Sequence, residues 1–216
     1  MTTIRHHLND DLLLAYASGN LSEGWSLAVA THLAMCAQCR KGLALAEAAG
    51  GALLEELEPL GGDDDAWEKL KTRLITEAPP KAAPKVQPAS AVIPEPLRSY
   101  LGGDLADLKW RSIGTAHQIL IKTADRETQV RLLRIPAGKP VPEHSHGGRE
   151  LTVVLRGAFH DEVDQFGPGD IEDADGSLTH QPVADADEDC ICLAVTDAPL
   201  RFTSRLVRLV QPFLGI

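Results

Sequence analysis

The sequence lacks three features, and each absence excludes a class of protein. No hydrophobic stretch approaches the ~20 residues of a membrane-spanning helix, and the first ten residues contain no apolar signal-peptide core. Basic residues are too few for a free-standing nucleic-acid-binding protein, because 31 Asp and Glu outnumber 21 Lys and Arg. We therefore expect a cytoplasmic chain with no direct contact to nucleic acid or membrane. Its net charge of −10 suits either a basic protein partner or solubility alone.

Cysteine is also scarce. The four cysteines form two close pairs, Cys36/Cys39 and Cys190/Cys192. In a reducing compartment, such pairs favour metal binding or thiol chemistry over structural disulfides.

Three stretches of the 216 residues differ in composition. Residues 1–77 are rich in Ala and Leu and carry apolar residues at helical spacing, which predicts a small four-helix unit. Residues 78–96 hold six of the fourteen prolines and predict a stiff linker. Residues 97–216 alternate apolar and polar residues in short runs between turn residues, which predicts an all-β barrel or sandwich.

Capping residues suggest where the helices begin. Asn9 and Ser22 can cap the first two helices, and we expect the third to end before the Gly50-Gly51 pair. A fourth helix follows the acidic run 63–65. It lies beside the linker, apart from the other helices, so its apolar face needs another surface to cover it. We expect that face to bind a partner through Trp67, Leu70 and Leu74.

The helical stretch contains a metal-binding pattern. His32, Cys36 and Cys39 are four and three residues apart, so on a helix their side chains lie on one side. Two thiolates and an imidazole are ligands that suit zinc. His6 and His7 are the other histidines in this stretch, and we favour His7 as fourth ligand. The alternatives are a buried Cys-x-x-Cys beside a satisfied histidine, or a redox pair, although a redox pair expects a βαβ pattern that is missing.

An upstream histidine followed by His-x-x-x-Cys-x-x-Cys in a four-helix segment resembles the zinc-binding anti-sigma domain. In that family the domain binds an extracytoplasmic-function sigma factor and blocks its access to RNA polymerase. The resemblance implies that the fourth helix packs into the sigma factor. It also implies that the zinc ligands are His7, His32, Cys36 and Cys39.

A second metal-binding pattern lies in the β stretch. His144 and His146 are two residues apart and share one face of an extended chain, and a glycine turn can return Glu150 to that face. From Gly138 to Gly157 the sequence resembles the first cupin motif at every position, which implies a double-stranded β-helix (jelly-roll) barrel. The fourth cupin ligand would be His180, although the usual proline before it is missing.

This ligand set can hold zinc, iron, manganese or nickel. If all four ligands bind, a zinc site is closed, which is typical of structural or regulatory sites. The alternatives are a metal-free cupin, or an iron or manganese dioxygenase or an isomerase.

The second cysteine pair falls in a predicted strand. Cys190 and Cys192 share a strand face at a spacing that disfavours an unstrained disulfide. They are either small core residues or oxidisable thiols near the cupin metal.

The combination of the two units resembles the ChrR-type anti-sigma factors. The resemblance implies a non-enzymatic protein that binds and inhibits one RpoE-like sigma factor in a 1:1 complex, with one Zn²⁺ in each unit. It further implies release of the sigma factor on oxidative stress, such as singlet oxygen or organic peroxide, sensed through the cupin. The alternatives are a cupin metalloenzyme (dioxygenase or isomerase type) with a helical zinc-binding interaction module, or an interaction module for another protein.

Overall fold

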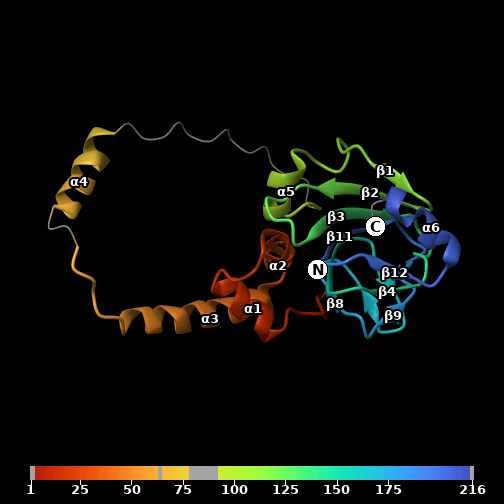
Figure 1. Ribbon diagram of the computed structural model, residues 1–216, viewed down its shortest axis with the longest axis horizontal. Coiled ribbons are helices and arrows are strands. Elements are labelled where there is room, and N and C mark those ends of the chain that lie inside the picture. The colour runs from red at the N-terminus through yellow and green to blue at the C-terminus, as the bar shows by residue number, and fades with distance from the viewer. Residues whose placement is uncertain (1–2, 63–64, 78–91, 215–216) are drawn as a thin grey trace.

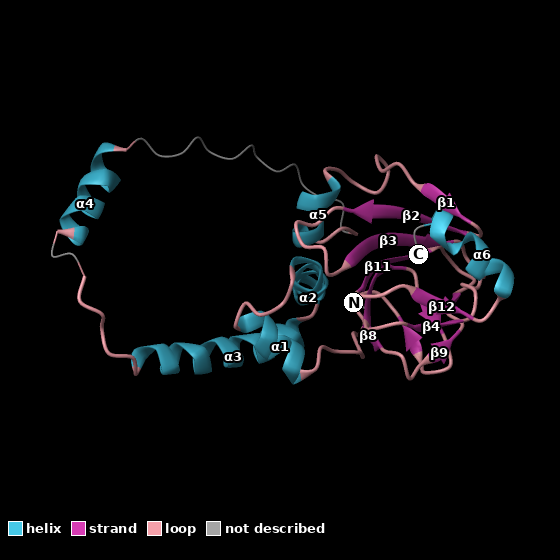
Figure 2. Ribbon diagram, viewed as in Figure 1, coloured by secondary structure: helices cyan, strands magenta, loops and turns pink. Residues whose placement is uncertain are grey.

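The computed structural model describes residues 3–62, 65–77 and 92–214, which form a helical part followed by a part built from short strands (Figure 1). Figure 2 shows the division by secondary structure, with α6 after the last strand. Among these residues, no helix is long and apolar enough to cross a membrane. The helices are α1 (Asp10–Ala17), α2 (Glu23–Met35), α3 (Ala37–Glu55), α4 (Ala66–Thr76), α5 (Glu95–Leu101) and α6 (Arg205–Leu214).

The strands form three antiparallel sheets. The large sheet has the order β1-β2-β3-β11-β5-β8, and the two small sheets have the orders β10-β6-β7 and β12-β4-β9. Strand β11 comes late in the chain but lies between β3 and β5, as in a jelly roll. The strands are β1 (Arg111–Ile113), β2 (Ala116–Ile121), β3 (Gln129–Ile135), β4 (His144–His146), β5 (Glu150–Arg156), β6 (Phe159–His160), β7 (Gln165–Phe166), β8 (Ile171–Ala174), β9 (Thr179–His180), β10 (Val183–Ala184), β11 (Cys190–Thr196) and β12 (Leu200–Phe202).

The central strands of the large sheet, β5 and β11, are buried on both faces. On β11, Ile191, Leu193 and Val195 pack in one hydrophobic cluster with the helices, whereas Cys192 and Ala194 line a cavity on the opposite face. This alternation follows from the two-residue period of a strand. The helical part and the barrel therefore share one core. The buried helical side chains in this core include Leu27, Ala28, Val29 and Leu33 of α2 and Leu97 of α5.

The capping predictions succeed in part. Asn9 caps α1, because its side-chain oxygen accepts a hydrogen bond from the Leu12 N–H at 2.8 Å. Ser22 occupies the cap position of α2, but its side chain makes no capping bond. The predicted break at Gly50-Gly51 is wrong, since α3 runs on to Glu55. Strong helix formers surround the two glycines, each of which costs only about 1 kcal/mol relative to alanine.

Helix α4 stands apart from the barrel, and none of its residues is buried (Figure 1). Most of the predicted linker, residues 78–91, lies outside the described residues. The residues that follow it are folded: Ile93 is buried, and α5 packs against α2. This fifth helix was not predicted, because the prolines around it suggested only extended chain. The unit boundaries at residues 77 and 97 stay predictions.

The start of α2 lies against the turn between β2 and β3. A Cβ atom on Gly24 would lie 2.1 Å from Thr128 Oγ1 and 2.9 Å from Val130 Cγ2. The Gly24 N–H also donates a hydrogen bond to Asp125 Oδ2 at 2.8 Å. Only glycine allows this approach of helix and barrel without rearrangement.

We expect Gly24→Ala to lower the free energy of unfolding by about 1–3 kcal/mol, because the added methyl group overpacks the helix–barrel contact. Thermal or urea denaturation measures this change. Gly51→Ala is the matched control, since Gly51 is also helical and its Cβ would meet no atom within 4 Å. It should be neutral or stabilise by up to about 1 kcal/mol. Equal effects of the two substitutions would contradict the proposed close contact.

Two candidate metal centres

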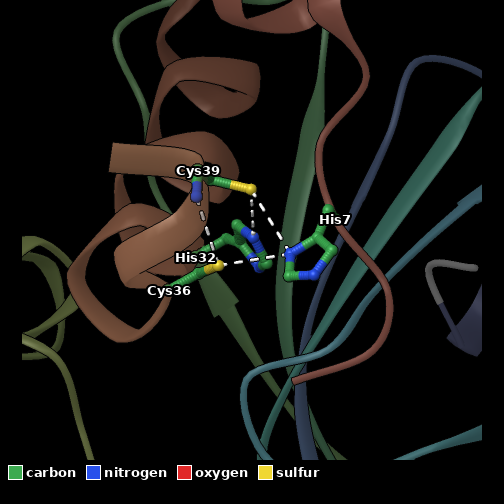
Figure 3. Close-up of side chains that lie close together, drawn as sticks. All are labelled: His7, His32, Cys36 and Cys39. Carbon is green, nitrogen blue, oxygen red and sulfur yellow. Dashed lines mark hydrogen bonds between the residues drawn. The ribbon is translucent and has the colours of Figure 1, made fainter. Parts of the chain in front are cut away.

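The first centre gathers side chains from three segments of the helical part (Figure 3). His7 comes from the extended chain before α1, and His32 from the last turn of α2. Cys36 separates α2 from α3, and Cys39 follows in the first turn of α3. One ligand atom from each residue lies within 4.8 Å of all the others. The structure thus brings together the four predicted ligands of the helical part.

The separations within this group match a tetrahedral ion. With Zn–S of about 2.3 Å and Zn–N of about 2.0–2.1 Å, sulfur and nitrogen ligands of one tetrahedral ion lie about 3.6 Å apart. Cys36 Sγ and Cys39 Sγ lie 3.3 and 3.6 Å from His7 Nδ1. His32 Nε2 lies 3.2 Å from Cys39 Sγ. The donor set and its spacing therefore fit zinc.

Burial affects the protonation of the first centre. It lowers the pKa of His32 to about 4, so the imidazole is neutral at pH 7 and keeps a lone pair for a metal. Burial also raises the pKa of Cys39 to about 11. Without a metal this thiol is protonated, and metal binding must displace its proton.

The second centre lies inside the barrel. His144 and His146 are on β4, and His180 is on the neighbouring strand β9. Nε2 of His180 lies 3.1 Å from Nε2 of His146 and 3.2 Å from Nε2 of His144. Two imidazole ligands of a tetrahedral ion lie about 3.3 Å apart. Burial lowers the pKa of His144 and of His146 to about 4, so these rings are neutral. Three nitrogens facing one another fit a cation between them.

Glu150 is not a member of this histidine group. One of its oxygens lies 3.7 Å from Nδ1 of His146, the ring nitrogen that does not face the other histidines. Its other oxygen accepts a hydrogen bond from Thr152 Oγ1 at 2.9 Å. Burial raises the pKa of Glu150 above its usual value. Its role as a ligand stays a prediction.

Two acidic residues that were not predicted hold His180 in place. Asp161 Oδ2 accepts from His180 Nδ1 at 2.6 Å, and Glu172 Oε1 lies 3.3 Å from the same nitrogen. Burial lowers the pKa of His180, but these carboxylates outweigh it and raise the pKa to about 9. Burial also raises the pKa of Glu172 to about 7. At pH 7 the metal-free ring is therefore protonated on both nitrogens. Nδ1 keeps its proton in the hydrogen bond to Asp161, so metal binding must displace the proton on Nε2, the nitrogen that faces the other histidines.

The second centre opens onto a cavity of about 310 Å³ between the large sheet and the small sheets. His144, His180 and Cys192 all line it. Cys190 and Cys192 are both buried free thiols. A hydrogen bond with Cys190, burial and nearby carboxylates raise the pKa of Cys192 well above its usual value. Cys192 is therefore a protonated thiol, whereas the reactive form of cysteine is the thiolate.

The predicted partner-binding residues on α4 are all exposed, and Trp67 is 62% accessible. The structure adds exposed apolar side chains beyond the three predicted residues. They are Leu45, Leu53 and Leu54 on α3, Leu57 and Leu60 after it, and Ile75 on α4. Sequence reasoning missed Leu53 and Leu54 because α3 was expected to end before Gly50.

Comparison with known proteins identifies relatives of the whole chain. Residues 101–199 match the family described as the ChrR Cupin-like domain. The anti-sigma-E factor ChrR of Cereibacter sphaeroides is 48% identical over 215 residues, which cover 99% of this chain and 100% of the relative. The crystal structure of Rhodobacter sphaeroides SigE in complex with the anti-sigma ChrR superposes with a TM-score of 0.81 at 46% identity, covering 90% of this chain and 100% of that chain.

These relatives confirm the predicted fold class, a helical region followed by a cupin. They also confirm the resemblance that the two motifs predicted, and the chain belongs to the ChrR family of anti-sigma factors.

Proposed function

We propose that this chain binds and inhibits an RpoE-like extracytoplasmic-function sigma factor in a 1:1 complex. The observation that carries the proposal is the set of large apolar side chains exposed along α3, after it and on α4, which nothing in the described residues covers. They are Leu45, Leu53, Leu54, Leu57, Leu60, Trp67, Leu70, Leu74 and Ile75. Large apolar side chains exposed in such number on two helices indicate a surface for a protein partner. The family relative found in complex with SigE supports a sigma factor as that partner.

The arrangement of α3 and α4 suits a helix-rich partner. Both helices extend away from the barrel, and α4 lies at the far end of the molecule (Figure 1). An amphipathic helix of this kind binds by laying its apolar face in a groove of its partner. The acidic net charge of −10 steers the encounter with a basic surface. The chain would act in the cytoplasm, where a sigma factor meets RNA polymerase.

Each centre would hold one Zn²⁺. In the first centre, the metal would tie the chain before α1 to α2 and α3, so that binding stabilises the helical unit. In the second, His144, His146 and His180 would hold the metal, with Glu150 as the predicted fourth ligand. Imidazoles also suit iron, manganese and nickel, so zinc there rests on the family resemblance. A bound Zn²⁺ supplies positive charge and four-fold coordination rather than redox chemistry.

Oxidative stress, such as singlet oxygen or organic peroxide, would release the sigma factor through damage in the cupin. The second centre is the first candidate for that damage because its histidines open onto the cavity. Cys190 and Cys192 are a second candidate, although the protonated state of Cys192 slows its oxidation.

One observation favours an alternative, a cupin metalloenzyme. The cavity beside the second centre is large enough for a small substrate. Membership of an anti-sigma family favours the regulatory function, in which the chain is not an enzyme.

The partner surface is tested by Leu74→Ala. We expect it to weaken sigma-factor binding by about tenfold or more, since large apolar anchors at interfaces contribute about 1–2 kcal/mol or more. Leu209→Ala on α6 is the matched control, because Leu209 is 72% exposed and Leu74 71% exposed. Binding is measured by titration calorimetry with a purified RpoE-like sigma factor. If the two substitutions have the same effect, α4 is not the contact.

The metal centres are tested by metal content per chain. We expect two metal ions in the wild type and one in Cys39→Ala or in His144→Ala. Cys39→Ala should also lower the free energy of unfolding by at least about 2 kcal/mol, because small Cys/His zinc sites contribute folding energy. His160→Ala should keep both ions, since this ring is 54% exposed and bonded to Asp185 outside both centres. Two ions retained in Cys39→Ala would contradict the first centre.

The cysteine pair is tested by changing Cys190 and Cys192 together to Ala. We expect release of the sigma factor by organic peroxide to stay within about twofold of wild type, because both thiols are buried and that of Cys192 is protonated. Release is followed by fluorescence anisotropy of a labelled sigma factor. A response lost in the double variant would instead make these thiols the reporters of the oxidant.

A further inference from the structure

The chain that carries His7 is bound to the barrel as well as to the helices. The backbone N–H groups of Arg5 and His6 donate to Asp170 Oδ1 at 2.6 and 2.9 Å. His6 Nε2 lies 3.1 Å from Asp164 Oδ2. Burial alone would raise the pKa of Asp170, but the N–H groups that donate to it hold the pKa below its usual value. A charged, buried carboxylate of the barrel therefore anchors the residues next to a ligand of the first centre.

The same stretch of barrel holds a ligand of the second centre. Asp161 Oδ2 accepts from His180 Nδ1, and its Oδ1 accepts from the backbone N–H groups of Val163 and Asp164 at 2.9 and 3.2 Å. Asp161 and Asp164 thus belong to one hydrogen-bonded turn. Glu172, which also approaches His180, is two residues from Asp170. Two short stretches of the barrel therefore connect the centres. One runs from Asp161 to Asp164, and the other from Glu172 to Asp170.

We infer that residues 161–172 are a shared support for both metal centres, which makes metal retention at one centre depend on the other. This inference rests on the metal centres proposed above. Asp161 and Glu172 are positioning residues for His180, and Asp164 and Asp170 are positioning residues for His7. Damage to His180 frees the two carboxylates, loosens the support, and so weakens the hold on His7. The helical centre would then lose its metal more readily.

His144 offers a matched comparison within the same centre. It also faces the other two histidines, but a different element orients it, since its Nδ1 donates to the Pro142 carbonyl at 2.8 Å. Removing either His144 or His180 deletes one imidazole from the second centre. Only the loss of His180 releases Asp161 and Glu172.

The experiment measures how fast the full-length chain loses cobalt from the first centre. Cobalt replaces zinc in both centres, and only the first, with its two thiolates, gives a sulfur-to-cobalt absorption band. After addition of excess EDTA, the decay of this band is compared between His180→Ala and His144→Ala. We expect decay about tenfold faster in His180→Ala, at the lower end of what outer partners of metal ligands contribute.

Combined substitutions test whether the two centres are coupled through Asp164 and Asp170. Adding Asp164→Ala and Asp170→Ala to each histidine variant should reduce the difference between the two to less than about twofold, because the support is then already detached. Asp161→Asn, which keeps every histidine and the side-chain volume, should also speed the decay relative to wild type. This variant covers the case in which His180→Ala does not fold.

The outcomes separate this inference from the proposed function. Equal decay in His180→Ala and His144→Ala, or wild-type decay in Asp161→Asn, would overturn the shared support but leave the metal centres intact. A complete absence of the sulfur-to-cobalt band in the wild type would overturn the first metal centre and this inference with it. Sigma-factor binding is measured separately and affects neither result.

Discussion

Burial of the central strands of the large sheet on both faces is the constraint on which the rest of the molecule depends. Each of these strands must present apolar side chains to the helices and a different set to the cavity. The face toward the helices is filled by large aliphatic residues such as Leu193. The cavity face carries Glu150, Thr152 and Cys192 instead. One face of the large sheet thereby joins the helices to the barrel, and the opposite face lines the cavity beside the second centre.

Sequence spacing predicted the metal ligands that lie close together in the chain. His32, Cys36 and Cys39 are close in sequence, and helical periodicity alone places them together. His144 and His146 share a strand face for the same kind of reason. The choice of His7 rather than His6 agrees with its place in the first group, whereas His6 turns toward Asp164.

Contacts between residues far apart in the chain could not be predicted from the sequence. Asp161 and Glu172 approach His180 only because the sheets bring their segments together, and no spacing in the sequence signals that contact. The shared core was missed for a related reason. An alternating strand pattern shows that a face is buried but not which element covers it. The proline-rich stretch suggested two separate units, whereas α2 packs directly on the barrel and α5 packs against α2.

The shared core also has a consequence for synthesis of the chain. The apolar side chains of α2, such as Leu27 and Val29, are covered by strands that include β11, which ends at Thr196. At about 5–20 residues per second, a ribosome needs on the order of 10 to 40 s to reach that point. During that interval the helices exist without their barrel, and they expose the face that will join it as well as the face on α3 and α4. A nascent chain thus exposes an apolar helical face that the finished protein buries against its barrel.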